Sequence, residues 1–100
     1  MAAAMTALTL AGGAQASPVR VEAWAFPANQ VLVRQRVLRG ALETTFPALH
    51  VEVQCRGLHP VVLARGGRGF LQIRCTTSLK IPDYIYHLDS QGRMYVTRSW

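Results

Sequence analysis

The sequence predicts an α+β domain in which an N-terminal strand and one amphipathic helix pack on a four- to five-stranded antiparallel meander. First, residues 51–55 and 70–75 both alternate apolar and polar side chains on either side of a glycine-rich reversal, as half-buried paired strands do. Second, the apolar period changes to that of a helix from Asn29 onward. Third, residues 84–88 and 94–98 flank a short polar turn and indicate a hairpin. This order is the layout of cystatin-like folds, as an analogy of shape and not of function.

The first half of the chain predicts a strand followed by the helix. Residues 19–26 alternate in the manner of a strand, which Pro27 ends. A helix over residues 29–45 follows, with Asn29 as its N-cap and Pro47 closing it. Its apolar stripe comprises Val31, Leu38, Leu42 and Thr45, with Val37, Ala41 and Phe46 beside it.

The second half reads as consecutive strands. Separate strands are expected at residues 50–56 and 61–64, followed by a turn at 65–69 in which three glycines supply positive φ. A long central strand is expected at 70–77, and then the hairpin around residues 89–92. The turn at 65–69 also resembles a single RGG element of RNA-binding segments, but a lone copy between two apolar runs favours a turn.

Composition sets the class of protein and its partners. The chain has 100 residues and a net charge of +6, with eleven basic residues against five acidic ones, which suits one small domain. All the basic residues except Lys80 are arginine. A GC-rich genome explains this bias, and so does recognition of phosphate or carboxylate groups, which guanidinium groups bind. A basic surface favours anionic partners such as nucleic acid, anionic lipid or a cell-wall polymer.

The N-terminal residues 1–16 are predicted to be a signal peptide, leaving a single domain at 17–100. A short apolar run and a glycine break precede Ala14-Gln15-Ala16, which matches the small-residue cleavage pattern. No charged residue occurs before Arg20, so the alternatives are a start further upstream, a disordered tail or an amphipathic helix. The run is shorter than the roughly twenty apolar residues that a membrane-spanning helix needs.

The two cysteines, Cys55 and Cys75, share the apolar parity of their strands, in line with Leu71 and Ile73 on the second strand. We therefore expect them to form a disulfide, as suits an oxidising compartment. The alternatives are two free buried thiols, or a metal site that adds His59 and His87 to the cysteines. Because these four residues lack the two tight ligand pairs of typical zinc sites, neither a metal nor a cofactor is expected.

One surface could carry recognition. Tyr84, Tyr86 and Tyr95 lie on the predicted C-terminal hairpin, and together with Arg74, Arg93 and Arg98 they form a possible anionic-ligand surface that stacks bases or sugars. The alternative is that the tyrosines pack against the helix. His50 and His87 read as surface imidazoles. The chain has no nucleophile elbow, phosphate loop or paired carboxylates, so no catalytic residue is expected and the protein is predicted not to be an enzyme.

The chain from the helix to the C-terminus resembles the small two-cysteine secreted domains of unknown function found in actinobacterial lipoproteins. The matching features are residues 51–55, the run that ends at Cys75, and the tyrosine-bearing hairpin with Asp89-x-x-Gly92. Leu10-Ala11-Gly12 precedes a lipidated cysteine in a lipobox, but Gly13 stands at that position, so lipid anchoring does not carry over. The resemblance implies an exported helix-plus-sheet module and no activity.

The predicted function is that of an exported, disulfide-stapled, non-catalytic binding domain, secreted or associated with the periplasm or cell envelope. Its partner would be an anionic cell-envelope polymer or another protein. One alternative is a cytoplasmic, basic nucleic-acid-binding module with reduced cysteines. The other is a protease-inhibitor-like domain, suggested only by the strand–helix–sheet order.

Overall fold

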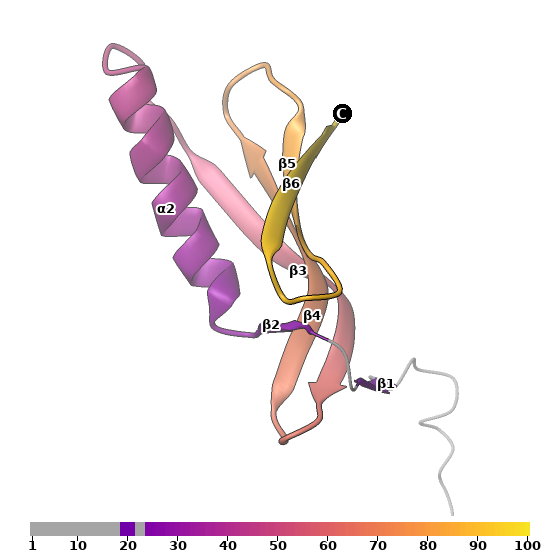
Figure 1. Cartoon of the computed structure of the whole chain (residues 1–100). Helices are drawn as coiled ribbons and strands as arrows, with labels where there is room; N and C mark the ends of the chain where they lie inside the picture. The colour runs from indigo at the N-terminus through magenta and orange to yellow at the C-terminus, as the bar shows by residue number, and fades with distance from the viewer. Residues whose placement is uncertain (1–18, 22–23) are drawn as a thin grey trace, which may run out of the picture.

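The computed structural model describes residues 19–21 and 24–100, and the predicted signal peptide at 1–16 lies outside the described residues. Its elements are β1 (Val19–Val21), β2 (Phe26–Pro27), α2 (Gln30–Thr45), β3 (Val53–Leu63), β4 (Arg68–Thr77), β5 (Asp83–Leu88) and β6 (Met94–Ser99). Figure 1 shows α2 running alongside the sheet formed by the strands. In the described part of the chain, no helix is long and apolar enough to cross a membrane.

The sheet confirms the predicted α+β class. Its strand order is β1-β3-β4-β5-β6, and β3 to β6 form a four-stranded antiparallel meander. The expected first strand at 19–26 is wrong as one element, because its two ends pair with different strands. β1 runs parallel to the end of β3, whereas β2 pairs antiparallel with the start of β4.

The two strands expected at 50–56 and 61–64 form one strand, β3, which continues through Pro60. An irregularity at His59, with φ of 57°, lies in its middle. The Cys55 N–H points away from β4, since it donates to Gln35 Oε1 of α2 at 3.0 Å, whereas the Leu63 N–H donates across the hairpin to Gly67 O at 2.9 Å. In a regular antiparallel ladder these two positions, an even number of residues apart, would point the same way. The ladder therefore changes phase between them, in the part of β3 that contains His59.

The helix begins one residue later than expected, at Gln30, and ends as predicted at Thr45. Asn29 occupies the N-cap, but its side chain makes no capping hydrogen bond. On the predicted stripe Leu38 and Leu42 are buried and Val31 is half-buried, but Thr45 is exposed. Val37 is 53% exposed, so the part of the helix surface next to that stripe does not contribute to the core.

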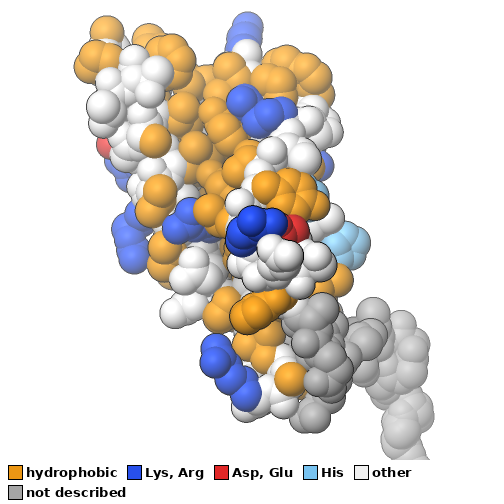
Figure 2. All heavy atoms as spheres, viewed as in Figure 1, with side chains coloured by type: hydrophobic (Ala, Val, Ile, Leu, Met, Phe, Trp, Pro, Cys, Tyr) orange, Lys and Arg blue, Asp and Glu red, His pale blue; other side chains and the backbone are white. Residues whose placement is uncertain are grey.

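The core lies between α2 and the meander, with Val51, Ile73 and Cys75 completely buried. Cys55 and Cys75 stand directly opposite each other on β3 and β4, with 4.0 Å between their Cα atoms, and form the predicted disulfide. Figure 2 shows apolar side chains gathered between α2 and the β5–β6 hairpin, which indicates that the helix covers this side of the sheet only in part.

Both hairpins close where turns were predicted, but β4 begins at Arg68, so Gly69 belongs to a strand and its predicted positive φ is wrong. Gly66 and Gly67 have positive φ in the β3–β4 turn, as only glycine does without strain. In the β5–β6 turn the carboxylate of Asp89 accepts hydrogen bonds from the N–H groups of Gln91 and Arg93, at 2.8 and 2.9 Å. An aspartate that bonds the backbone a few residues ahead is a common device for fixing a turn.

Candidate functional site

The side of the sheet opposite α2 is here called the open face. Its residues follow from the strand register, because Ile73 and Tyr86 are paired and buried toward the helix, so their neighbours along β4 and β5 point the other way. The open face includes Arg56 and Leu58 of β3, Gln72 and Arg74 of β4, Asp83, Ile85 and His87 of β5, and Tyr95 and Thr97 of β6.

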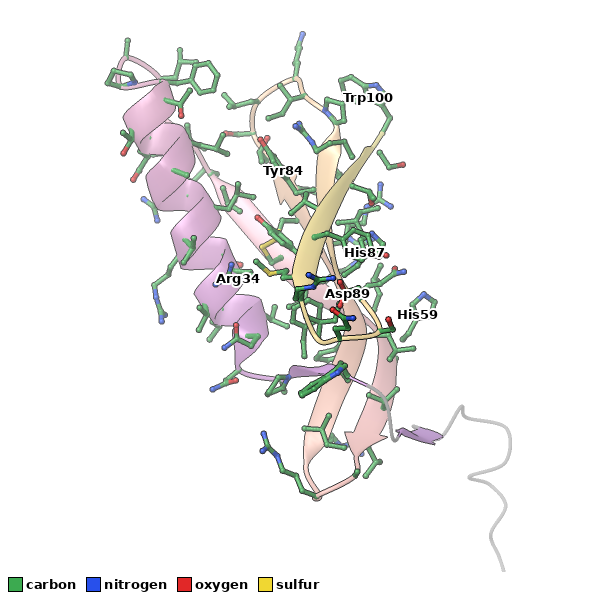
Figure 3. The ribbon with its side chains drawn as sticks, viewed as in Figure 1. Arg34, His59, Tyr84, His87, Asp89 and Trp100 are labelled. Atoms are coloured by element: carbon green, nitrogen blue, oxygen red, sulfur yellow. A yellow bond between two sulfur atoms is a disulfide. The ribbon has the colours of Figure 1, made fainter. Side chains whose placement is uncertain are left out.

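A cleft of about 510 Å³ lies at one end of the open face. Its walls are formed by Trp24 just before β2, by the middle of the β3–β4 hairpin, and by the turn end of the β5–β6 hairpin. Figure 3 shows the positions of the labelled residues His59, His87 and Asp89 relative to the sheet. The lining residues are Trp24, His59, Leu71, Gln72, His87, Leu88, Asp89, Ser90 and Tyr95.

The irregularity at His59 helps to explain why there is a cleft at this point. The register that pairs Leu58 with Gln72 and Pro60 with Phe70 puts Leu71 opposite His59, and both of these residues line the cleft. Leu71 is 39% exposed, so its expected place on the apolar parity beside Ile73 is wrong. On the helix side, Phe70 takes the space over Gly57, where an added Cβ would fall within its ring.

Aromatic rings dominate the wall of the cleft. The rings of His87 and Tyr95 are stacked, with centroids 4.7 Å apart and planes inclined by 8°. His87 Nε2 lies 2.7 Å from Thr97 Oγ1, which fixes the ring in that position. Trp24 is 58% exposed and lies against Gly92, where even a Cβ would come within 2.7 Å of the indole. Gly92 therefore leaves the room that the indole occupies beside the turn.

Among the described residues that line the cleft, Asp89 supplies the one carboxylate, and this carboxylate is held by hydrogen bonds within the turn. Hydrogen bonds from the backbone N–H groups of Arg93 and Gln91 hold the pKa of Asp89 below its usual value. The Arg93 Nε–H also donates to Asp89 Oδ2 at 3.2 Å. Asp89 thus stays ionised at neutral pH and shapes the turn.

The six residues of the predicted anionic-ligand surface are divided by the strand register. Tyr84, Tyr86 and Arg98 lie on the helix side. The guanidinium of Arg98 lies 3.8 Å above the ring of Tyr84 and donates to the Pro82 carbonyl oxygen at 2.9 Å. Burial raises the pKa of Tyr86, an effect that the nearby charge of Arg34 partly offsets.

The other three lie elsewhere. Arg74 is on the open face, where its Nε–H donates to Asp83 Oδ2 at 2.8 Å and a terminal N–H donates to the Trp100 carbonyl oxygen at 3.2 Å. Tyr95 is also on the open face but at the cleft end, and Arg93 belongs to the turn. The structure therefore brings Arg98 and Tyr84 together, but does not bring all six residues into one surface.

The sequence did not single out Trp24, Leu71 or Gln72 as site residues, and treated His87 as a surface imidazole. One signal was available for part of the cleft. Aligning the inner ends of the predicted strands, residues 84–88 and 94–98, places His87 opposite Tyr95, as in the structure.

The metal alternative finds no support in the part of the chain that the structure describes. Both cysteine sulfurs are used by the disulfide, and no cluster of three or more His, Cys, Asp or Glu residues is present there. What the cleft offers is a set of exposed rings with amide and hydroxyl groups from Gln72 and Ser90 among them. Such a surface suits a ligand with flat apolar faces and many polar edges.

Comparison of the chain with family models, curated proteins and solved structures finds no match. The resemblance to actinobacterial two-cysteine domains stays a prediction, and the cystatin-like layout is not confirmed. The functional argument therefore depends on the site itself.

Proposed function

We propose that this chain is an exported, non-catalytic binding domain whose open-face cleft binds sugar units of an anionic cell-envelope polymer. The observation that carries the proposal is the cleft, in which exposed Trp24 and the stacked His87–Tyr95 pair surround polar side chains. Pyranose rings present apolar C–H faces that pack on aromatic rings, and their hydroxyl groups bond to amides such as that of Gln72.

Charge supports an anionic polymer over a neutral one. The chain carries a net charge of +6. On the open face, Arg56 lies directly opposite Arg74, and the charge of Arg74 is offset by its ion pair with Asp83. Arg56 is exposed and separated from His59 by two residues of β3, which places it within about 10 Å of the cleft at ~3.3 Å per residue. A polymer that occupies the cleft and continues along β3 would bring its next charged group to Arg56.

The hydrogen bonds and ion pair of Asp89 and Asp83 support a binding role over catalysis. Asp89 is tied to the turn backbone and Asp83 to Arg74. A carboxyl group that serves as a general acid needs a pKa near the working pH, whereas the pKa of Asp89 is lowered.

Export is supported by the disulfide and by residues 1–16. Disulfides persist in oxidising compartments and are rare where the cytosol keeps thiols reduced. Fusing residues 1–20 to a reporter is expected to direct the reporter out of the cytoplasm. A reporter that stays inside, with and without an added basic start, would remove this part of the proposal and favour the nucleic-acid alternative.

The binding test uses Trp24 as its own reporter. The chain has two tryptophans, so Trp100→Phe leaves Trp24 as the only one. Heparin, as a soluble anionic polysaccharide, is titrated against this variant while its indole emission is recorded, with dextran as the neutral polysaccharide and single-stranded DNA as the competing polyanion. We expect heparin to shift the Trp24 emission, dextran to bind more weakly, and added salt to weaken binding to heparin.

The control variants separate the cleft from general charge. Tyr95→Ala in the same background should weaken heparin binding about tenfold, since a lost ring contact is worth ~1–3 kcal/mol when measured for bases. Leu32→Ala, at an exposed apolar position of α2, should leave binding unchanged. Equal losses from both variants would refute the cleft as the site, and tighter binding of single-stranded DNA than of heparin would favour the nucleic-acid module.

A further inference from the structure

The last strand of the sheet, β6, leaves one edge open. In the sheet order β6 pairs with β5 on one side, and no strand among residues 19–21 and 24–100 pairs with its other side. Met94, Tyr95 and Val96 are 44%, 49% and 44% exposed. The strand carries one charged residue, Arg98, and no proline, and its register with β5 is regular over its whole length. Natural proteins usually protect such an edge with charges, prolines or bulges, because it can pair with another strand.

The free backbone groups of β6 can be assigned. The Asp89 N–H donates to Arg93 O at 2.9 Å, so this pair, which continues the β5–β6 register, is hydrogen-bonded. Bonded and non-bonded pairs alternate along an antiparallel ladder. Tyr95 and Thr97 therefore bond to β5. The N–H and C=O groups of Met94, Val96 and Arg98 point outward.

These outward residues are arranged symmetrically about Val96. We propose that β6 pairs antiparallel with β6 of a second copy of this chain, around a two-fold axis that passes through Val96. In this register Val96 faces Val96 of the second copy, and Met94 faces Arg98. All the outward backbone groups of both strands are then paired. A register shifted by two residues leaves one outward residue of each strand without a partner, and a shift by one opposes residues from different faces.

The side chains suit the same register. On the helix side, the paired Val96 residues extend the apolar layer that reaches β6 through the buried Tyr86, its partner in the β5–β6 register. Arg98 opposes Met94 and not another arginine, so like charges do not face each other. Its guanidinium is already held over Tyr84 and by the Pro82 carbonyl. On the open face, Tyr95 lies opposite Thr97 of the second copy.

This pairing is independent of the proposed binding function, but it would affect how that function works. A two-fold axis perpendicular to the sheet keeps the two open faces on the same side. The dimer would therefore offer two clefts to one polymer chain, which raises apparent affinity without a new contact.

The test measures the mass of the full chain in solution by light scattering coupled to size exclusion, over a concentration series. The parent is expected to approach twice its 11.0 kDa chain mass as concentration rises. Val96→Pro removes an N–H that makes no bond to β5, so it should weaken the dimer at least about tenfold, a factor that corresponds to ~1.4 kcal/mol. Proline is tolerated at such outward positions of edge strands.

A charge-pairing experiment tests the register and keeps the Val96 N–H. Val96→Lys and Val96→Glu should each be monomeric alone, because like charges meet on the axis. An equimolar mixture of these two chains should form a dimer containing one of each. Mixing Val96→Lys with Thr97→Glu is the matched control and should form no more mixed dimer than mixing Val96→Lys with the parent, since the introduced glutamate would lie on the open face and not opposite the introduced lysine.

Two results would overturn the proposal. One is a parent chain that stays monomeric at every concentration. The other is a parent dimer that the Val96→Lys chain forms equally well with its circular dichroism spectrum unchanged. If only the proline variant misfolds, the Val96→Lys and Val96→Glu chains decide the proposal, because both keep the Val96 N–H.

Discussion

Removing the Cys55–Cys75 disulfide is expected to lower the free energy of unfolding by an amount that follows from its position in the chain. The replacement is Cys55→Ala with Cys75→Ala. Alanine is preferred to serine because Cys75 is 0% exposed, and a serine hydroxyl there would be buried without a designed partner.

The magnitude comes from the loop that the disulfide closes. The cysteines are 20 residues apart. A cross-link over such a loop removes about 11 cal/mol/K of entropy from the unfolded chain, or about 3.3 kcal/mol at 25 °C. For a domain of this size, 1 kcal/mol shifts the melting temperature by ~4–8 °C, so the expected loss is about 13–26 °C.

Urea unfolding monitored by circular dichroism gives the free energy of unfolding of the parent and of the double variant, each with and without reductant. The reduced parent isolates the cross-link, since it keeps both sulfur atoms in the core. The double variant adds the loss of sulfur packing and should be insensitive to reductant. If the oxidised and the fully reduced parent differ by less than about 1 kcal/mol, the chain-entropy reasoning is refuted for this protein.

Three further predictions concern single positions. Gly57→Ala should cost about 1–3 kcal/mol, because its Cβ would fall within the ring of Phe70, whereas Gly40→Ala on the open helix surface should gain ~1 kcal/mol; urea unfolding compares the two. Burial raises the pKa of Tyr86, so the neutral phenol stabilises the folded state up to pH ~10, and that contribution is lost as pH rises through the folded pKa. Absorbance at 295 nm should show one phenol that titrates later than the others, and Tyr86→Phe should remove it. The pKa of Asp89 is lowered, so the stabilising contribution of its carboxylate is present above pH ~3.9 and is lost as pH falls through the folded pKa. Asp89→Asn should therefore reduce the loss of stability in acid. A parent whose stability does not fall below pH ~3.9 would contradict the role of the turn carboxylate.

The parts of the fold that were predicted depend on local patterns. The disulfide followed from the shared parity of Cys55 and Cys75 on strands joined by a glycine-rich turn, and the β5–β6 hairpin from the turn at Asp89. In each case the partners are linked through a single hairpin, so the pattern of one strand and the type of turn determine which residues meet.

The continuity of β3 could not be predicted, because Gly57 and Pro60 both indicate a break in the strand. The structure accommodates them differently. Gly57 leaves room for the ring of Phe70, and Pro60 lies beside the irregularity at His59. A histidine with positive φ is uncommon, and nothing in the neighbouring residues points to it.

The cleft was missed for a related reason. Its lining residues come from five separate segments, and Trp24 reaches it only because β2 pairs with the start of β4. The pairing of the two-residue β2 is a tertiary contact with no periodic signature. The apolar parity of Leu71 also changes at the irregularity, so a regular alternation assigned it to the core.

The position of the disulfide along the β3–β4 hairpin also has a consequence for local unfolding. Cys55 and Cys75 lie beside the helix-covered core, while the hairpin continues beyond them to its turn at Gly66 and Gly67. This outer arm is held by the short pairings with β1 and β2. Because a covalent link keeps the inner rungs in register, the arm can open and close again without the rest of the ladder losing its alignment. Amide hydrogen exchange should therefore divide one continuous hairpin into two cooperative units, with the boundary near the staple and fast exchange towards the turn.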